Sequence, residues 1–149
     1  EAIRPLLKDE TLDLSTLMTR IEDPKDWLNP HIVKVVVDQK NFALYFSRSP
    51  IPFPRDLHIG RLESSPFGTN RPLPKRVFKH IVIYVFRRKF LLQFSKMKPT
   101  PLEKLEKLEQ LRALENGYRI KVTPVSYEPL CVDTPEDLEK VITYFSHPQ

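Results

Sequence analysis

The sequence is poor in glycine and cysteine and contains no long hydrophobic run. Its 149 residues include three glycines and one cysteine. The single Cys131 excludes an internal disulfide bond and a metal cluster built from thiolates. No apolar segment approaches the roughly 20 residues that cross a bilayer, and the first residues do not resemble a signal peptide. The sequence therefore predicts a cytoplasmic protein that does not bind a membrane.

The three glycines are not grouped into a loop that could surround a phosphate. They stand apart, at Gly60, Gly68 and Gly117. Phosphate-binding loops need small residues so that backbone N–H groups can approach the ligand closely. A nucleotide enzyme would therefore carry its phosphate loop elsewhere. The chain also lacks an initiator Met and begins as if a helix were already under way, so we expect a fragment of a longer protein.

The chain is basic, with a formal net charge of +5. A basic balance suggests nucleic-acid binding. However, most basic residues alternate with acidic ones, as in residues 103–107, which is typical of a solvated helix face. We expect a modest attraction for anionic substrates and no nucleic-acid partner, and a nucleic-acid-binding domain is the weakest alternative.

Hydrophobic patterns predict strands that alternate with helices. The predicted strands cover residues 14–21, 32–37, 42–46, 77–86 and 119–125, and the main predicted helices cover residues 1–8, 87–96, 101–117 and 135–145. Residues 33–46 are expected to form a β-hairpin. This order predicts an α/β fold with a mostly parallel sheet. The proline-rich segment 49–76 reads as a functional loop, with a low-complexity linker as the alternative.

One carboxylate, Asp133, lies at a predicted strand-to-helix turn. It comes just before Thr134, a good N-cap, and Pro135, which suits the first helical position. In open α/β sheets, ligands bind outside the carboxyl ends of the strands. Asp133 could therefore hold a divalent metal for a phosphate substrate. The alternative, which this run alone favours, is a capped surface helix with a solvated aspartate.

Two pairs of side chains are candidates for binding an anion or a polar ligand. Arg48 and Arg55 flank prolines, and their planar guanidinium groups can bind a carboxylate or phosphate through two hydrogen bonds. Two exposed arginines are an equal alternative. His80 and Tyr84 are four residues apart on one predicted strand and therefore share a face. Their alternative is a hydrogen-bonded core histidine beside a tyrosine.

Glu109 and Gln110 lie beside a stripe of leucines in the predicted helix 101–117. From the pattern alone we read them as exposed polar residues of that helix. The sequence contains no Ser/His/Asp signature and no pair of histidines at helical metal-binding spacing. The single cysteine has no evident partner, so we exclude a hydrolase or a protease.

Six segments of the chain match one known family in the same order. They contain Asn29-Pro30 with Val33 to Val36, Ala43 to Arg48, Ile51-Pro52 with Arg55-Asp56, His80 to Tyr84, Pro101 to Glu103 with Leu108 to Arg112, and Val132 to Leu138. Together they resemble the 3-deoxy-manno-octulosonate (Kdo) cytidylyltransferases. The resemblance runs nearly end to end.

This resemblance implies a three-layer α/β/α fold of the nucleotide-diphospho-sugar transferase type, with a mostly parallel sheet and a protruding hairpin. Residues 1–149 would form the C-terminal portion of one nucleotidyltransferase domain that lacks its nucleotide-binding half. In the family, CTP binds with magnesium, and the anomeric hydroxyl of Kdo attacks the α-phosphate. The products are pyrophosphate and CMP-Kdo, which is used for lipopolysaccharide synthesis. The family acts as a homodimer, and we expect this chain alone to be inactive.

The resemblance also implies roles for single residues. Asp133 would be the catalytic, metal-binding aspartate of this portion. The positions that match the family's sugar site are Arg48, Arg55, His80, Tyr84, Glu109 and Gln110. Among these we assign Arg55 and His80 to the sugar carboxylate, and Glu109 and Gln110 to sugar hydroxyls.

The chain departs from the family at two glycine positions and in one segment. Val82 and Cys131 stand where the family usually has glycine, and we expect side chains there to crowd a ligand or a neighbouring backbone. Residues 57–76 do not align. Two alternatives stay open: a cytidylyltransferase for another acidic sugar, such as a sialic acid or an amino-Kdo, and a non-catalytic binding or assembly module derived from the fold.

Overall fold

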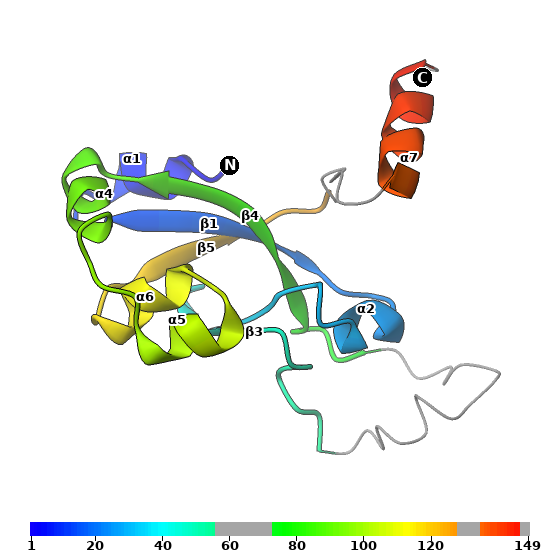
Figure 1. Cartoon of the computed structure of the whole chain (residues 1–149), viewed down its shortest axis with the longest axis horizontal. Coiled ribbons are helices and arrows are strands. Elements are labelled where there is room, and N and C mark those ends of the chain that lie inside the picture. Colours follow the sequence, from blue (N-terminus) through cyan, green and yellow to red (C-terminus); the bar gives the residue numbers. More distant parts are fainter. Residues whose placement is uncertain (56–72, 128–134, 147–149) are drawn as a thin grey trace.

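A five-stranded sheet forms the centre of the fold (Figure 1). The structure is a computed structural model that describes residues 1–55, 73–127 and 135–146. Its strands are β1 (Leu14–Arg20), β2 (Lys34–Val37), β3 (Ala43–Ser47), β4 (Phe78–Phe86) and β5 (Ile120–Pro124). They lie in the order β3-β2-β4-β1-β5. The predicted α/β class and all five predicted strands are confirmed.

The described sheet is mixed rather than mostly parallel. β1 and β5 are parallel, whereas β1–β4, β2–β4 and β2–β3 are antiparallel pairs. Parallel neighbours need a long crossover connection, usually through a helix, whereas a short turn can join antiparallel ones. Such a turn joins β2 to β3. Helical segments connect β4 to β5. Strand β5 lies next to β1, on the side of β1 that faces away from β4, and runs parallel to it.

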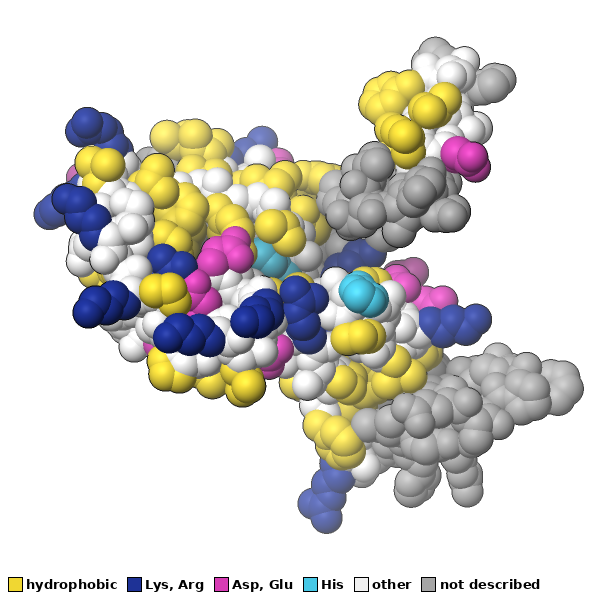
Figure 2. All heavy atoms as spheres, viewed as in Figure 1, with side chains coloured by type: hydrophobic (Ala, Val, Ile, Leu, Met, Phe, Trp, Pro, Cys, Tyr) yellow, Lys and Arg dark blue, Asp and Glu magenta, His cyan; other side chains and the backbone are white. Residues whose placement is uncertain are grey.

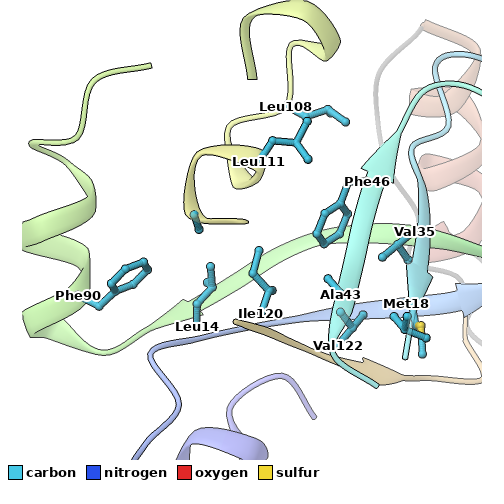
Figure 3. Packing of buried hydrophobic residues seen from close by; sticks show 12 residues of the cluster. Leu14, Met18, Val35, Ala43, Phe46, Phe90, Leu108, Leu111, Ile120 and Val122 are labelled. Atoms are coloured by element: carbon cyan, nitrogen blue, oxygen red, sulfur yellow. The ribbon is translucent and has the colours of Figure 1, made fainter. Parts of the chain in front are cut away.

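Helices cover both faces of this sheet, in agreement with the three predicted layers. The described helices are α1 (Arg4–Lys8), α2 (Pro24–Leu28), α4 (Arg88–Phe94), α5 (Pro101–Glu106), α6 (Gln110–Glu115) and α7 (Pro135–Ser146), of which α7 stands apart from the sheet in Figure 1. Successive residues of a strand point to opposite faces. Leu14 and Met18 of β1 therefore join the main core with Phe90 of α4 and Leu111 of α6 (Figure 3). On the other face, Leu17 packs with Ala2, just ahead of α1.

The predicted helix 101–117 is wrong in its middle, because the chain forms two helices there. Lys107 adopts the left-handed conformation, with φ 56°, and ends α5. The break allows Leu108 and Leu111 to enter the core while Leu105 stays 80% exposed. The predicted stop at Gly117 is confirmed. This residue has φ 80°, and its N–H donates to the carbonyl of Leu114 at 2.9 Å.

The predicted hairpin is confirmed, and its turn folds back onto β5. Asn41 adopts φ 58° in this turn, and its carbonyl accepts the N–H of Val122 at 2.9 Å. The Arg119 guanidinium lies 3.5 Å from the centre of the Phe42 ring. These contacts connect the edge hairpin to the strand at the opposite end of the sheet order, so the sheet is strongly curled.

The surface of the described part is mixed in character. On the face shown in Figure 2, Lys and Arg side chains are interspersed with acidic and hydrophobic ones rather than gathered into one basic surface. Helix α7 carries four exposed hydrophobic side chains, Leu138, Ile142, Tyr144 and Phe145. Among the helices that the structure describes, none is both long and apolar enough to cross a bilayer.

Candidate functional site

The candidate site is built around an irregularity between β1 and β4. Ser15 pairs with Val85, but Leu17 pairs with Ile81, so Thr16 alone lies opposite three residues of β4. A bulge of this kind leaves ladder groups without their usual partners. The Thr16 hydroxyl replaces one of these missing partners, because its oxygen lies 2.8 Å from the carbonyl oxygen of Ile83.

His80 lies beside this bulge and is nearly enclosed. The residue is 7% exposed, and its Nε2 lies 2.8 Å from the Thr16 hydroxyl oxygen. The ring meets the edge of Phe46 at 4.9 Å between centroids. Its Nδ1 is buried and has no hydrogen-bond partner among the described residues. Burial lowers the pKa of His80 to about 4, so the imidazole is neutral at neutral pH.

Tyr84 lies next to His80, as their spacing predicts. The two ring centroids are 5.4 Å apart. Tyr84 also lines an open pocket of about 250 Å³, together with Glu109 and Gln110. Burial, and then the negative charge of Glu109, raise the pKa of Tyr84 well above its ordinary value. Its phenol therefore stays protonated and can donate or accept a hydrogen bond.

The rest of the pocket wall is apolar, with Phe86 and Phe94 among its lining residues. Ligand pockets of this kind combine apolar walls with a few polar groups that fix the orientation of the ligand. Tyr84, Glu109 and Gln110 are the polar residues of this lining, although the exposed pocket wall is almost entirely apolar. Their phenol, carboxylate and amide groups are of types that can exchange hydrogen bonds with hydroxyl groups.

Glu109 and Gln110 reach this pocket because the helix breaks at Lys107. The new helix α6 begins at Gln110, and Glu109 precedes it as the N-cap residue. Glu109 is exposed, as the sequence pattern predicts, but Gln110 is only 3% exposed. The reading of Gln110 as an exposed helix residue is therefore wrong. It assumed an uninterrupted helix.

Arg48 is held by backbone carbonyls outside this pocket. Its Nε donates to the carbonyl of Glu106 at 2.9 Å, and its Nη1 donates to the carbonyl of Pro30 at 3.0 Å. The Glu106 carboxylate accepts the backbone N–H of Arg48 at 3.0 Å and the Ser47 hydroxyl at 2.6 Å. Glu106 thus anchors the start of the loop that follows β3.

Lys34 is a buried cation that the sequence analysis missed. Its side chain is fully buried, and its ammonium donates to the carbonyls of Asn29 at 2.8 Å, Ile32 at 2.6 Å and Arg48 at 2.6 Å. Burial lowers the pKa of Lys34 to about 8, with a further lowering from Arg48 that Glu106 opposes. The ammonium group is therefore still mostly protonated at pH 7, and its three N–H donors match the three carbonyl acceptors. A lysine inside the β-branched run 32–37 was the available signal.

Of the remaining residues singled out in the sequence, some are placed outside the pocket and others are not described by the structure. Arg55 is exposed, and the structure does not place it among the pocket residues. Asp133 and Cys131 lie outside the described residues. Val82 is 67% exposed, so its side chain does not crowd the described part of the chain.

The described residues contain no cluster of three metal-binding side chains. Within residues 1–55, 73–127 and 135–146, no group of three or more His, Cys, Asp or Glu side chains could hold a metal ion. The oxygen of a carboxylate such as Asp133 is nevertheless the type of ligand that magnesium prefers. The magnesium prediction thus depends on Asp133 and on ligands from elsewhere in a longer polypeptide.

Comparison with known proteins identifies the class to which this fold and site belong. A family model described as "Cytidylyltransferase" matches residues 1–120. The chain therefore belongs to the cytidylyltransferase family.

The relatives that it matches carry a more specific name. The chain is 54% identical, over 142 residues, to a protein of Geotalea uraniireducens named 3-deoxy-manno-octulosonate cytidylyltransferase, with 95% of this chain and 55% of the relative covered. A protein of Geobacter metallireducens with the same name is 51% identical over 146 residues, with 98% of this chain and 56% of the relative covered.

A solved structure agrees with both. It is described as CMP:2-keto-3-deoxy-manno-octonic acid synthetase complexed with CTP, and it superposes with a TM-score of 0.80 at 35% identity. The match covers 97% of this chain and 54% of that one. The chain thus spans about half the length of the relatives it matches.

Proposed function

We propose that the longer polypeptide containing this chain is a cytidylyltransferase that couples CTP with Kdo, and that this chain supplies the sugar site. The observation that carries the proposal is the pocket where Tyr84, Glu109 and Gln110 meet beside His80. It occurs in a chain that is 54% identical to a relative named for this reaction. Pyrophosphate and CMP-Kdo would be the products, used for lipopolysaccharide synthesis.

The chemistry of the reaction fits a site that positions its substrates. In the proposed reaction, the anomeric hydroxyl oxygen of Kdo forms a bond to the α-phosphorus of CTP, and the bond to pyrophosphate breaks. Such transfers depend on orientation and on neutralisation of charge, with little covalent work for the protein. Tyr84, Glu109 and Gln110 would orient the sugar through its hydroxyl groups, and the apolar pocket wall would exclude water.

Two further elements of the proposal involve Asp133, which lies outside the described residues, and Arg55, which is exposed and outside the pocket. Asp133 would hold magnesium, which neutralises phosphate charge when it is bound. Arg55 would attract the sugar carboxylate. We also propose a homodimer in the cytoplasm. Val82 and Ile83, 67% and 47% exposed on β4, offer an apolar surface that a second copy could cover.

A substitution that keeps the size of the side chain but removes its negative charge tests the sugar site. We expect Glu109→Gln, in the longest natural polypeptide that contains this sequence, to raise the KM for Kdo about tenfold, because a hydrogen bond to a charged group is lost. The KM for CTP should stay within about twofold, since Glu109 would contact only the sugar. Pyrophosphate release from CTP and magnesium, measured over a range of Kdo concentrations, gives both constants.

Glu22→Gln is the matched control, because Glu22 is an exposed carboxylate far from the pocket. Leu14, at the start of β1, lines the pocket, whereas Glu22 follows the other end of this strand. This variant should behave as the wild type. An unchanged KM for Kdo in Glu109→Gln would show that this pocket is not part of the sugar site. A wild-type polypeptide that releases no pyrophosphate in response to Kdo would contradict the proposed function itself.

A further inference from the structure

The Thr16 hydroxyl lies among three polar groups in a fully buried position. Its oxygen is 2.8 Å from His80 Nε2, 2.8 Å from the carbonyl oxygen of Ile83 and 3.2 Å from the carbonyl oxygen of Ile81. Thr16 itself is 0% exposed, so water does not compete for these positions. Two of the three neighbouring groups are carbonyls, which can only accept a hydrogen bond.

This geometry determines which nitrogen of His80 carries the proton. A threonine hydroxyl has one proton to donate and two lone pairs. If that proton pointed at Nε2, the hydroxyl oxygen would face two carbonyl oxygens without a hydrogen between them, which is repulsive. The hydroxyl therefore donates to the carbonyls and accepts from His80. Nε2 carries the proton, and Nδ1 has a free lone pair.

The free nitrogen is the buried atom without a partner. His80 Nδ1 has no hydrogen-bond partner among the described residues. Because burial among Phe46 and Tyr84 keeps the ring neutral, this nitrogen does not gain a proton near neutral pH. A buried acceptor left unpaired is unfavourable, because it has lost its hydrogen bonds to water. In native proteins such groups are rare, and a functional role of the group is one of the reasons for which they occur.

We propose that Thr16 positions His80 as a neutral acceptor, so that Nδ1 receives a hydrogen bond from a hydroxyl group of the sugar. The inference deepens the proposed function and depends on it for the identity of the ligand. Tyr84 contacts the His80 ring and also lines the pocket, so a ligand there is one side chain away from His80. Because Nδ1 is buried, the contact requires a rearrangement of the side chains around His80.

This role differs from the one that the resemblance implies for His80. A carboxylate can only accept hydrogen bonds, and a bare nitrogen also accepts. The two would repel each other. The sugar carboxylate must then be bound by other groups, and His80 would select for a hydroxyl at its position. Thr16 touches no ligand itself and acts through the imidazole.

The tautomer can be measured directly by nuclear magnetic resonance. The experiment uses the longest natural polypeptide that contains this sequence, with ¹⁵N-labelled histidine, and assigns the His80 signals by their loss in His80→Gln. Two-bond and three-bond ¹H–¹⁵N correlations distinguish a protonated from a bare ring nitrogen. We expect a protonated Nε2 and a bare Nδ1 without sugar, and a shift of Nδ1 towards the hydrogen-bonded position when Kdo binds.

A second pair of variants separates positioning from simple structural support. Thr16→Val keeps the shape but removes the hydroxyl, so Nδ1–H becomes populated and the KM for Kdo should rise about tenfold. The KM for CTP should not change. Thr16→Ser keeps the hydroxyl and should restore both the tautomer and the KM for Kdo. If Thr16→Val does not fold, the tautomer of the wild type still decides the inference.

Two results would overturn the inference. A protonated Nδ1 in the wild type without sugar would contradict the tautomer argument and leave the proposed function intact. An Nδ1 signal unmoved by Kdo, in a protein that turns over Kdo, would remove the hydroxyl contact. Absence of Kdo-dependent turnover in the wild type would instead overturn the proposed function, and the sugar part of this inference with it.

Discussion

Replacement of Lys34 by methionine is expected to lower the free energy of unfolding by about 3 kcal/mol. The ammonium of Lys34 donates to three backbone carbonyls at 2.6–2.8 Å, and methionine leaves all three without that donor. Each lost bond contributes about 1 kcal/mol or more to stability. The cost of burying the charge disappears with the lysine and offsets part of this loss.

The three carbonyls belong to segments that are separate in the sequence. Asn29 and Ile32 precede β2, whereas Arg48 follows β3, so Lys34 connects the two ends of the hairpin. We expect the loss of stability to be accompanied by a displaced Arg48 loop. Methionine fills a similar volume, which makes a packing defect a minor contribution.

Equilibrium unfolding in urea, followed by circular dichroism, measures the change for Lys34→Met. Lys104→Met is the matched control, because Lys104 is an exposed residue of α5 and lysine and methionine have similar helix propensities. The control should stay within about 0.5 kcal/mol of the wild type. Equal unfolding midpoints for the two variants would show that the buried ammonium does not hold the hairpin ends together.

Replacement of Asp133 by asparagine is expected to reduce kcat at least about 100-fold. The amide has the size of the carboxylate but no negative charge, so it would bind magnesium poorly. Helix α7 begins at Pro135, as the sequence predicts, which puts Asp133 two residues before the helix. The magnesium concentration for half-maximal rate should also rise, and that shift separates loss of the metal from misfolding.

The control for this variant is Glu139→Gln, an exposed carboxylate of α7. It should retain the wild-type rate and the wild-type magnesium dependence. Pyrophosphate release at saturating CTP and Kdo provides the measurement for both variants. If Asp133→Asn keeps its rate at low magnesium, the metal is bound by other residues.

The strands were predictable because their signals are local. The β-branched run of β2 and the apolar run of β4 predict strands independently of the surrounding structure. The four-residue spacing of His80 and Tyr84 predicts that both side chains lie on one face of the sheet. The relative direction of neighbouring strands was harder to predict from the sequence. Whether β4 runs parallel or antiparallel to β1 depends on residues about sixty positions apart in the sequence.

The break between α5 and α6 shows why the pocket was only partly predictable. The capping box at Thr100 and the stop at Gly117 are local signals that mark the outer ends. The break at Lys107 has no such signal. It results from Leu108 and Leu111 packing into the core, and it decides that Gln110 lines the pocket.

Thr16 and Lys34 were missed for a related reason. A lysine inside the β-branched run 32–37 is itself unusual, but the carbonyl groups that bind Lys34 and Thr16 cannot be identified from the sequence around these two residues. Thr16 meets Ile81 and Ile83 because a bulge shifts the register of β4.

The central claim is that this chain supplies the Kdo site of a cytidylyltransferase. The most direct test is the rate of pyrophosphate release from CTP and magnesium by the longest natural polypeptide that contains this sequence. The acceptor would be Kdo, an amino-Kdo, a sialic acid, a neutral hexose or none. The account predicts release with Kdo that exceeds release with every other acceptor, and CMP-Kdo as the product by mass spectrometry. Faster release with another acidic sugar, or none with any acceptor, would contradict it.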